Sequence, residues 1–371
     1  MKQCPFCKAS IPNDAVKCQF CGEWVTNISR NNMNSITGIY SALATKYEIS
    51  EEIGRGGMAI VFKAIQKNLG RIVALKVINQ NLVNDSEFLS RFHREAQLVA
   101  RLNHSNIVHV YDEGIQNGYH YMAMEFLNGI NLYNRIQKEQ KLSIPEVITI
   151  GGQIANALQH AHSHGIIHRD IKSSNIIITQ EGRAVLLDFG IAYAAFGLKL
   201  TKTGTIFGTP EYMSPEQAQG EKVDYRTDIY SLGVVLFECL SGHSPFKGDN
   251  PITIIHKVIH EVPPLLSDIR PDIPVKLARV INKALAKNPE QRYASAVKFA
   301  QELEQAGRAF SSGMFELQNL KDNTETLKIN ARPQSVQDIP QIIKIKFITA
   351  LFIKITIITI IIIFIILSLR Y

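Results

Sequence analysis

The sequence HRDIKSSN at residues 168–175, followed by DFG at residues 188–190, determines the fold that we predict for this chain. Short apolar runs flank these polar residues: II at 166–167, III at 176–178 and VLL at 185–187. Runs of this length are typical of buried strands or core segments. The polar side chains therefore lie on connectors at the ends of these runs, where we expect them to share one rim.

This set of side chains has the composition that phosphoryl transfer requires: a carboxylate to accept a hydroxyl proton, a lysine to offset phosphate charge, and an amide and a carboxylate to hold Mg²⁺. The order His-Arg-Asp-x-x-x-x-Asn and then Asp-Phe-Gly resembles the catalytic signature of the protein kinases. The resemblance implies that Asp170 is the catalytic base, that Asn175 and Asp188 bind Mg²⁺ (or Mn²⁺), and that Lys172 contacts the γ-phosphate of ATP. The Asp-x-Lys-x-x-Asn form is similar to the serine/threonine branch.

The fold class that this resemblance implies is α+β, with a β-rich small lobe and a helical large lobe. The sequence IGRGGMAIV at 53–61 precedes the apolar run IVALKVI at 72–78. Glycines let backbone amides approach phosphates without obstruction by Cβ, and the pairing with Lys76 resembles the kinase glycine-rich loop and its phosphate-binding lysine. By this resemblance, the nucleotide-binding residues are Ile53, Gly54, Gly56, Ala59, Val61, Ala74, Lys76, Glu125, Leu127 and Ile177.

The segment between Asp85 and Leu102 has the apolar period of a helix, and Glu95 lies on its apolar face. Burying a carboxylate alone is costly, so we expect a cationic partner. Lys76 matches the lysine–glutamate pair of the kinase small lobe. The alternative is a glutamate at the edge of the apolar face that reaches solvent.

Residues 119–127 predict the last small-lobe strand and the hinge, with Met124 beside the adenine pocket. Residues 145–164 predict a helix that leads to the catalytic loop, because Pro145 begins it and Gly165 follows it. Three histidines cluster near its end, and charge at a helix C-terminus explains them more simply than metal ligation.

The sequence TKTGTIFGTPEY at 201–212 resembles a kinase activation loop followed by the segment that seats the acceptor hydroxyl. We expect a phosphate on Thr201, Thr203 or Thr205 that pairs with Arg169. The alternative is an exposed flexible loop without modification. Glu216, in the sequence SPE that closes the segment, is expected to pair with Arg292.

The first 24 residues contain two Cys-x-x-Cys pairs, Cys4 with Cys7 and Cys18 with Cys21. Two thiolate pairs on tight turns can complete a tetrahedral structural Zn²⁺ site, and the pairs resemble small bacterial zinc ribbons. So short a segment would depend on the metal for folding. A redox pair and a disulfide scaffold are the alternatives. Nucleic-acid binding is not expected, since few basic residues surround the cysteines.

Residues 309–341 are polar and predict a tether, and residues 347–369 are mostly isoleucine. A helix of that length spans a bilayer core, although Lys354 interrupts it. Lys344 and Lys346 favour a single-pass anchor with the kinase domain and N-terminus on the cytoplasmic side. A buried core helix or an aggregation-prone strand is the alternative.

The composition supports a globular chain: 371 residues, 46% hydrophobic, 20% charged, with a net charge of +7. We predict a zinc ribbon at 1–24, a linker at 25–45, a protein kinase domain at 46–308, a tether at 309–341 and a transmembrane helix at 347–369. The predicted activity is transfer of the γ-phosphate of ATP to protein Ser/Thr hydroxyls, with autophosphorylation of the activation loop. Family members often dimerise through the small lobe. The alternatives are an ATP-binding pseudokinase scaffold and a zinc-ribbon binding module regulated by the kinase domain.

Overall fold

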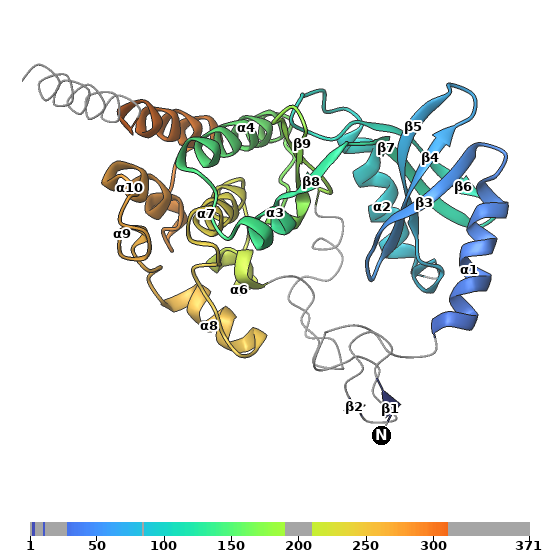
Figure 1. Cartoon of the computed structure of the whole chain (residues 1–371), viewed down its shortest axis with the longest axis horizontal. Coiled ribbons are helices and arrows are strands. Elements are labelled where there is room, and N and C mark those ends of the chain that lie inside the picture. Colours follow the sequence, from blue (N-terminus) through green and yellow to red (C-terminus); the bar gives the residue numbers. More distant parts are fainter. Residues whose placement is uncertain (1, 4–9, 12–27, 84, 190–209, 311–371) are drawn as a thin grey trace, which may run out of the picture. The chain divides into compact units, whose positions relative to one another are not determined.

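A computed structural model describes residues 2–3, 10–11, 28–83, 85–189 and 210–310. Residues 2–3 and 10–11 form a two-stranded antiparallel pair, β1 (Lys2–Gln3) and β2 (Ser10–Ile11). The rest forms two lobes, a five-stranded sheet with its helices followed by a helical lobe (Figure 1). The two-lobed architecture that we predicted is therefore confirmed.

The small lobe is an antiparallel sheet in the order β3-β4-β5-β7-β6. Its elements are α1 (Ile28–Leu43), β3 (Tyr47–Arg55), β4 (Ala59–Gln66), β5 (Arg71–Ile78), η1 (Gln80–Leu82), α2 (Ser86–Val99), β6 (Val110–Gln116) and β7 (Tyr119–Glu125). The predicted helix after Asp85 is α2, and the Asp85 side chain caps it by accepting a hydrogen bond from the backbone N–H of Phe88.

Successive side chains of a strand point to opposite faces, and here the two faces have different partners. On β5, Val73, Leu75 and Val77 pack in one cluster with Leu43 of α1, whereas Ala74 and Ile78 pack in another with the α2 phenylalanines. Lys76 has the same parity as Ala74 and Ile78. The lysine therefore projects on the face that carries α2.

The helix α1 occupies residues for which we predicted a linker. Ile39 and Leu43 are buried against the sheet, and a Cβ on Gly38 would lie 2.3 Å from the hydroxyl oxygen of Tyr119. A larger residue at this position would require the Tyr119 side chain to shift. The linker prediction was wrong over the helical residues, because asparagine, serine and glycine give this segment weak helix propensity and its packing against the sheet holds it instead.

The large lobe is mainly helical and carries one small sheet in the order β10-β9-β8. Its elements are β8 (Gly129–Asn131), α3 (Leu132–Glu139), α4 (Ile144–Ser163), η2 (Ser173–Asn175), β9 (Ile176–Thr179), β10 (Ala184–Leu186), η3 (Pro210–Tyr212), α6 (Pro215–Ala218), α7 (Arg226–Ser241), α8 (Pro251–His260), α9 (Leu266–Ile269), α10 (Val275–Ala284), η4 (Pro289–Gln291) and a helix over 296–310.

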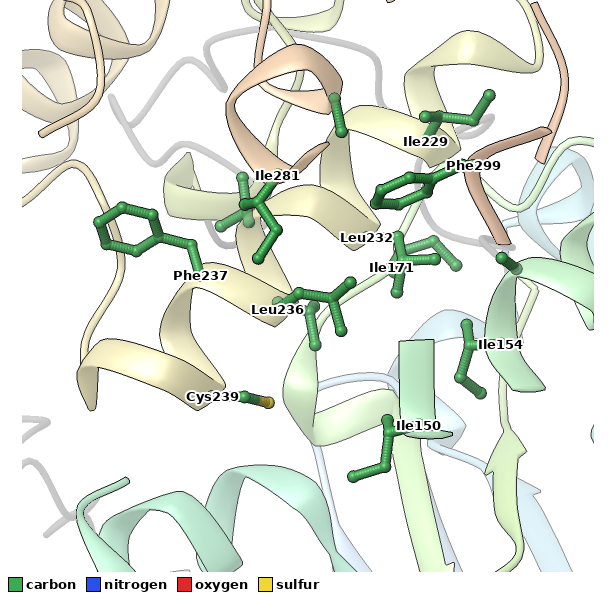
Figure 2. Close-up of a cluster of buried hydrophobic side chains, with 14 of the residues drawn as sticks. Ile150, Ile154, Ile171, Ile229, Leu232, Leu236, Phe237, Cys239, Ile281 and Phe299 are labelled. Atoms are coloured by element: carbon green, nitrogen blue, oxygen red, sulfur yellow. The ribbon is translucent and has the colours of Figure 1, made fainter. Parts of the chain in front are cut away.

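The helix α7 is the centre of the large lobe, and almost all of its residues are buried. Figure 2 shows its side chains gathered with Ile150 and Ile154 of α4 and with Ile281 of α10. A Cβ on Gly233 of α7 would lie 3.0 Å from the Cβ of Ala284, so glycine lets α10 approach closely. This packed core supports the short polar connectors that join α4, β9 and β10.

Candidate active site

The backbone before Asp170 is held by one buried carboxylate of α7. Asp228 is 0% exposed and accepts hydrogen bonds from the backbone N–H groups of His168 and Arg169, each at 2.8 Å. Nε2 of His162, on α4, lies 2.8 Å from the same carboxylate. Arg169 has a φ of +66°, a costly conformation for a residue with a Cβ. These bonds hold the strained turn that presents Asp170.

Asp170 lies at the centre of a small polar cluster. Its Oδ2 atom is 2.7 Å from Nζ of Lys172 and 3.1 Å from Nδ2 of Asn175. The same amide nitrogen also donates to the backbone carbonyl of Asp170 at 2.9 Å. These contacts use Oδ2 alone, which leaves Oδ1 of Asp170 to accept a further donor.

His168 connects this loop to the DFG sequence. Burial lowers the pKa of its imidazole, so the ring is neutral at pH 7. Nε2 lies 2.8 Å from the carbonyl of Leu187, and Nδ1 lies 3.2 Å from the backbone N–H of Asp170. A carbonyl needs a donor and an N–H needs an acceptor, so the proton is on Nε2. The ring also packs at 4.6 Å from Phe189.

Asn175 and Asp188 are brought together by a hydrogen bond of 2.8 Å from the Leu187 N–H to the Asn175 carbonyl. Asp188 forms an ion pair of 2.7 Å with Lys76 while 41% of its side chain stays exposed. Burial tends to raise the pKa of this carboxyl, but Lys76 holds it below its usual range. An ionised aspartate next to an amide oxygen suits Mg²⁺, which takes one or two protein oxygens together with water and phosphates.

An apolar cluster of side chains lies between the sheet and the large lobe. Predicted adenine-contacting residues from four separate segments meet in a single hydrophobic cluster: Ala59, Val61, Ala74, Met124, Leu127 and Ile177. The backbone N–H of Glu125 already donates to the carbonyl of His109 at 2.8 Å. Among the described residues, the N–H of Leu127 has no acceptor. That donor can therefore bind the edge of a base.

The glycine-rich turn is held by a side chain that the sequence did not suggest. Gly56 donates to the carbonyl of Ala59 at 2.9 Å, and Nδ2 of Asn79 donates to the carbonyl of Gly57 at 2.8 Å. Gly54 and Ile53 lie on β3, and 45% of Ile53 is exposed. Hydrogen bonds therefore close the turn, while Ile53 on the adjoining strand remains exposed to solvent.

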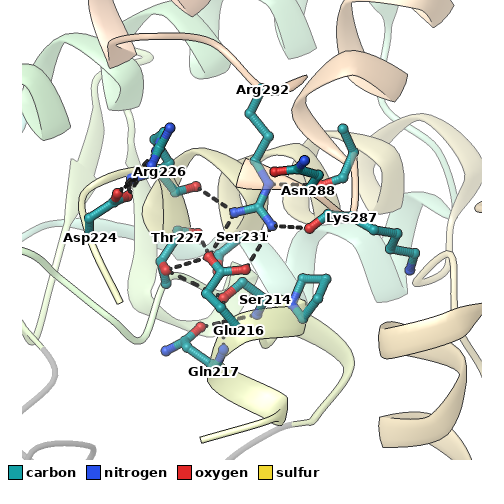
Figure 3. Close-up of polar contacts among 12 residues, drawn as sticks. Ser214, Glu216, Gln217, Asp224, Arg226, Thr227, Ser231, Lys287, Asn288 and Arg292 are labelled. Atoms are coloured by element: carbon teal, nitrogen blue, oxygen red, sulfur yellow. Dashed lines mark hydrogen bonds and ion pairs between the residues drawn. The ribbon is translucent and has the colours of Figure 1, made fainter. Parts of the chain in front are cut away.

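The segment after residue 209 is fixed by the predicted pair of Glu216 and Arg292, which is confirmed (Figure 3). Both Glu216 oxygens accept from the guanidinium at 2.7 Å, and Thr227 donates to Oε1 at 2.7 Å. Gln217 donates from Nε2 to the carbonyl of Arg169 at 2.9 Å. This segment is therefore tied to the catalytic loop.

Several predictions concern residues or side chains outside the described part of the chain. They are the four cysteines (Cys4, Cys7, Cys18 and Cys21), the three threonines (Thr201, Thr203 and Thr205), the tether and the apolar segment 347–369, together with the side chain of Glu95. No helix within the described ranges is long and apolar enough to cross a membrane. No group of three or more His, Cys, Asp or Glu side chains in those ranges is arranged to hold a metal ion.

The sequence interpretation missed two links. The His162 side chain is 6% exposed and contacts Asp228, so its position at a helix C-terminus does not explain it. The sequence signal for this contact was Asp228 itself, a carboxylate in the first turn of the apolar helix α7. Arg183 bridges the lobes by an ion pair of 2.5 Å with Glu125. Its position in a turn between two short strands gives no sequence signal.

Comparisons with known proteins agree with this geometry. The protein kinase domain family matches residues 47–305. A probable serine/threonine-protein kinase of Clostridium acetobutylicum is 42% identical over 267 residues, which are 71% of this chain and 40% of that protein. Serine/threonine-protein kinase PknB of Mycolicibacterium smegmatis is 42% identical over 267 residues, 70% of this chain and 43% of that protein.

The crystal structure of the Mycobacterium tuberculosis PknI kinase domain matches with a TM-score of 0.58 and 30% identity, over 70% of this chain and 96% of that one. The chain spans about two-fifths of the length of the first curated relatives. The similarity therefore concerns the two lobes. On the family match and the geometry of its site, the chain belongs to the protein kinase family, with relatives among the bacterial serine/threonine kinases.

Proposed function

We propose that this chain is a serine/threonine protein kinase that transfers the γ-phosphate of ATP to protein hydroxyls. The observation that carries the proposal is the arrangement around Asp170. One carboxylate oxygen is held by Lys172 and Asn175, the other has no hydrogen-bond partner among the described residues, and Asp188 lies beside the same loop in an ion pair with Lys76.

The open oxygen of Asp170 orients the acceptor hydroxyl and takes its proton. Lys172 is close enough to Asp170 to offset charge on the phosphate that moves past it, and Lys76 offsets charge on the phosphates that stay behind. Asn175 and Asp188 would hold Mg²⁺, which would supply positive charge to offset the negative charge of the phosphates. His168 and Asp228 hold the catalytic loop in position.

Regulation through the activation loop is part of the proposal. Nε of Arg169 is buried without a hydrogen-bond partner among the described residues. A guanidinium so placed, next to the catalytic aspartate, suits a phosphothreonine. Thr201, Thr203 and Thr205 are the proposed acceptors, and their autophosphorylation would supply a negatively charged partner for Arg169.

The chain's ends complete the proposal. We propose a structural zinc ribbon formed by the four N-terminal cysteines and a membrane anchor over residues 347–369, on the sequence evidence given above. Homodimerisation through the small lobe is proposed by analogy with the family alone. Zinc content of the purified full chain, and its partition into membranes with and without residues 347–371, test the first two.

Phosphopeptide mass spectrometry on the full chain incubated with Mg-ATP tests the activity, with Asp170→Asn as the control. The expected result is phosphate on at least one of the three threonines in the parent and none in the variant. Nucleotide binding without phosphate in either protein would instead support an ATP-binding scaffold without turnover.

A further inference from the structure

The catalytic loop is attached to the rest of the large lobe at a second point, which lies after Asp170 in the sequence. Ser173 follows Lys172 and begins η2. Its side chain is 0% exposed, and its Oγ lies 2.9 Å from the phenolic oxygen of Tyr212. A buried hydroxyl is costly unless it is hydrogen-bonded, so this contact is part of the local design of the loop.

Tyr212 is in turn fixed at both ends. Its hydroxyl donates to Oε2 of Glu238, on α7, at 2.7 Å, and its carbonyl accepts from Oγ of Ser231, also on α7, at 2.8 Å. Ser173, Tyr212 and Glu238 therefore form a chain of hydrogen bonds. The chain joins the catalytic loop, the segment at η3 and the central helix of the large lobe.

The direction of the hydrogen bonds follows from the acceptor at the end. An ionised Glu238 can only accept hydrogen bonds. The Tyr212 hydroxyl therefore donates its hydrogen bond to Glu238 and accepts one from the Ser173 hydroxyl. Burial raises the pKa of Glu238, while Tyr212 and then Ser173 lower it. Protonation of Glu238 adds a donor and reverses the chain. The Ser173 hydroxyl therefore favours the ionised state of the carboxylate.

The nucleotide side of the site does not depend on the hydrogen bonds that join Ser173, Tyr212 and Glu238. Asp170, Lys172 and Asn175 are linked by their own hydrogen bonds, and Asp188 is held by Lys76. Tyr212 belongs instead to η3, where the described residues resume after the activation loop. If phosphate transfer proceeds as proposed, this is the segment that seats the acceptor.

We propose that Ser173 is a positioning residue for the protein substrate. Its hydroxyl sets the position of the acceptor-seating segment relative to Asp170, by joining the loop to Tyr212 and Glu238. Gln217 makes a corresponding bond to the carbonyl of Arg169, so the segment is attached on both sides of Asp170. The inference rests on the proposed function and deepens it, because it assigns substrate capture to a residue outside the catalytic signature.

The test is steady-state kinetics of the full chain with Ser173→Ala, Tyr212→Phe and the double variant. The probe is one Ser/Thr peptide selected on the parent from a degenerate peptide library. We expect Ser173→Ala to raise the KM for the peptide about three- to tenfold, the effect of one buried neutral hydrogen bond. The KM for ATP should change less than about twofold, since the nucleotide side is held separately.

The double variant and the pH profile separate positioning from a general structural effect. Both hydroxyls act through one bond, so Ser173→Ala should have no further effect in a Tyr212→Phe background. In Ser173→Ala the acidic limb of kcat/KM for the peptide should move to higher pH, because the Ser173 hydroxyl, which lowers the pKa of Glu238, is removed. Glu211 and His243 also influence this pKa, and they are the same in the parent and the variant. Ser241→Ala is the control: it removes a buried hydroxyl on α7 whose Oγ lies 2.8 Å from the carbonyl oxygens of Phe237 and His243.

Equal changes in both KM values, additive effects of the two substitutions, or an unmoved acidic limb would overturn the inference. If Ser173→Ala is too unstable to assay, Tyr212→Phe alone must show the peptide-specific KM change, and its absence overturns the inference as well. A folded parent that binds ATP but phosphorylates no peptide would overturn the proposed function itself, which is a distinguishable result.

Discussion

Two ion pairs, one within the large lobe and one between the lobes, have the same length but differ in their exposure to solvent. Arg292 contacts Glu216 at 2.7 Å with 0% and 6% of the two side chains exposed. Lys76 contacts Asp188, also at 2.7 Å, with 14% and 41% exposed. The first pair is closed to water, and the second is partly exposed to it.

The surroundings of the two pairs explain what each can do. The Arg292 guanidinium also donates to the carbonyls of Ala286 and Lys287, at 2.8 and 3.0 Å, so its donors are used within the fold. Asp188 has one protein cation and a φ of +38°, a strained conformation of the kind that collects at functional sites. A fully satisfied pair fixes a segment, whereas a partly satisfied one can accept a ligand.

Breaking the closed pair should have the largest effect on stability. Arg292→Met leaves the Glu216 carboxylate buried without its partner, and we expect a loss of about 3–5 kcal/mol in the free energy of unfolding. Urea denaturation of the full chain measures it. Glu139→Gln, which breaks the more exposed pair with Arg135, is the control and should cost less than about 1 kcal/mol. Equal losses in the two variants would remove the distinction between closed and open pairs.

The helix α1 extends the comparison to the small lobe. Leu43 is 0% exposed against the sheet, so Leu43→Ala should lower the free energy of unfolding by about 2–4 kcal/mol. Leu69→Ala, at a position 61% exposed, should cost less than about 0.5 kcal/mol. If the two variants behave alike in denaturation experiments, the packing of α1 against the sheet does not stabilise the small lobe.

The smallest expected effect is a pH dependence of stability. Burial lowers the pKa of His104, His120 and His168 in the folded state, so the unfolded chain binds more protons just below the ordinary histidine pKa of about 6.5. Stability is therefore complete above that pH and falls as the pH decreases through it. Denaturation at pH 7.5 and 5.5 should show the loss.

A matched pair of variants assigns this pH dependence to buried rings. His120→Gln should make the slope of stability against pH shallower, because it removes a titrating ring that is only 7% exposed. His256→Gln, at an exposed position on α8, should leave the slope unchanged. A slope that neither variant alters would mean that other groups cause it.

The parts of the fold that could be predicted are those in which a local pattern carries the information. The order of the catalytic signature, the helix that begins after Asp85 and the pairing of Glu216 with Arg292 were all legible in the sequence. The parts that could not be predicted depend on tertiary packing. The helix α1 has weak propensity of its own, and the bond from Ser173 to Tyr212 joins residues 39 positions apart.

We propose that the Lys76–Asp188 pair belongs to a magnesium-dependent phosphoryl-transfer site rather than to the scaffold of the fold. The measurement that tests it most directly is the initial rate of phosphate transfer from ATP to a peptide across a Mg²⁺ titration, for the full chain and for Asp188→Asn. We predict a rate at least about 100-fold lower in the variant, with a free energy of unfolding within about 1 kcal/mol of the parent. An unchanged rate, or a loss of stability as large as that of Arg292→Met, would contradict the account.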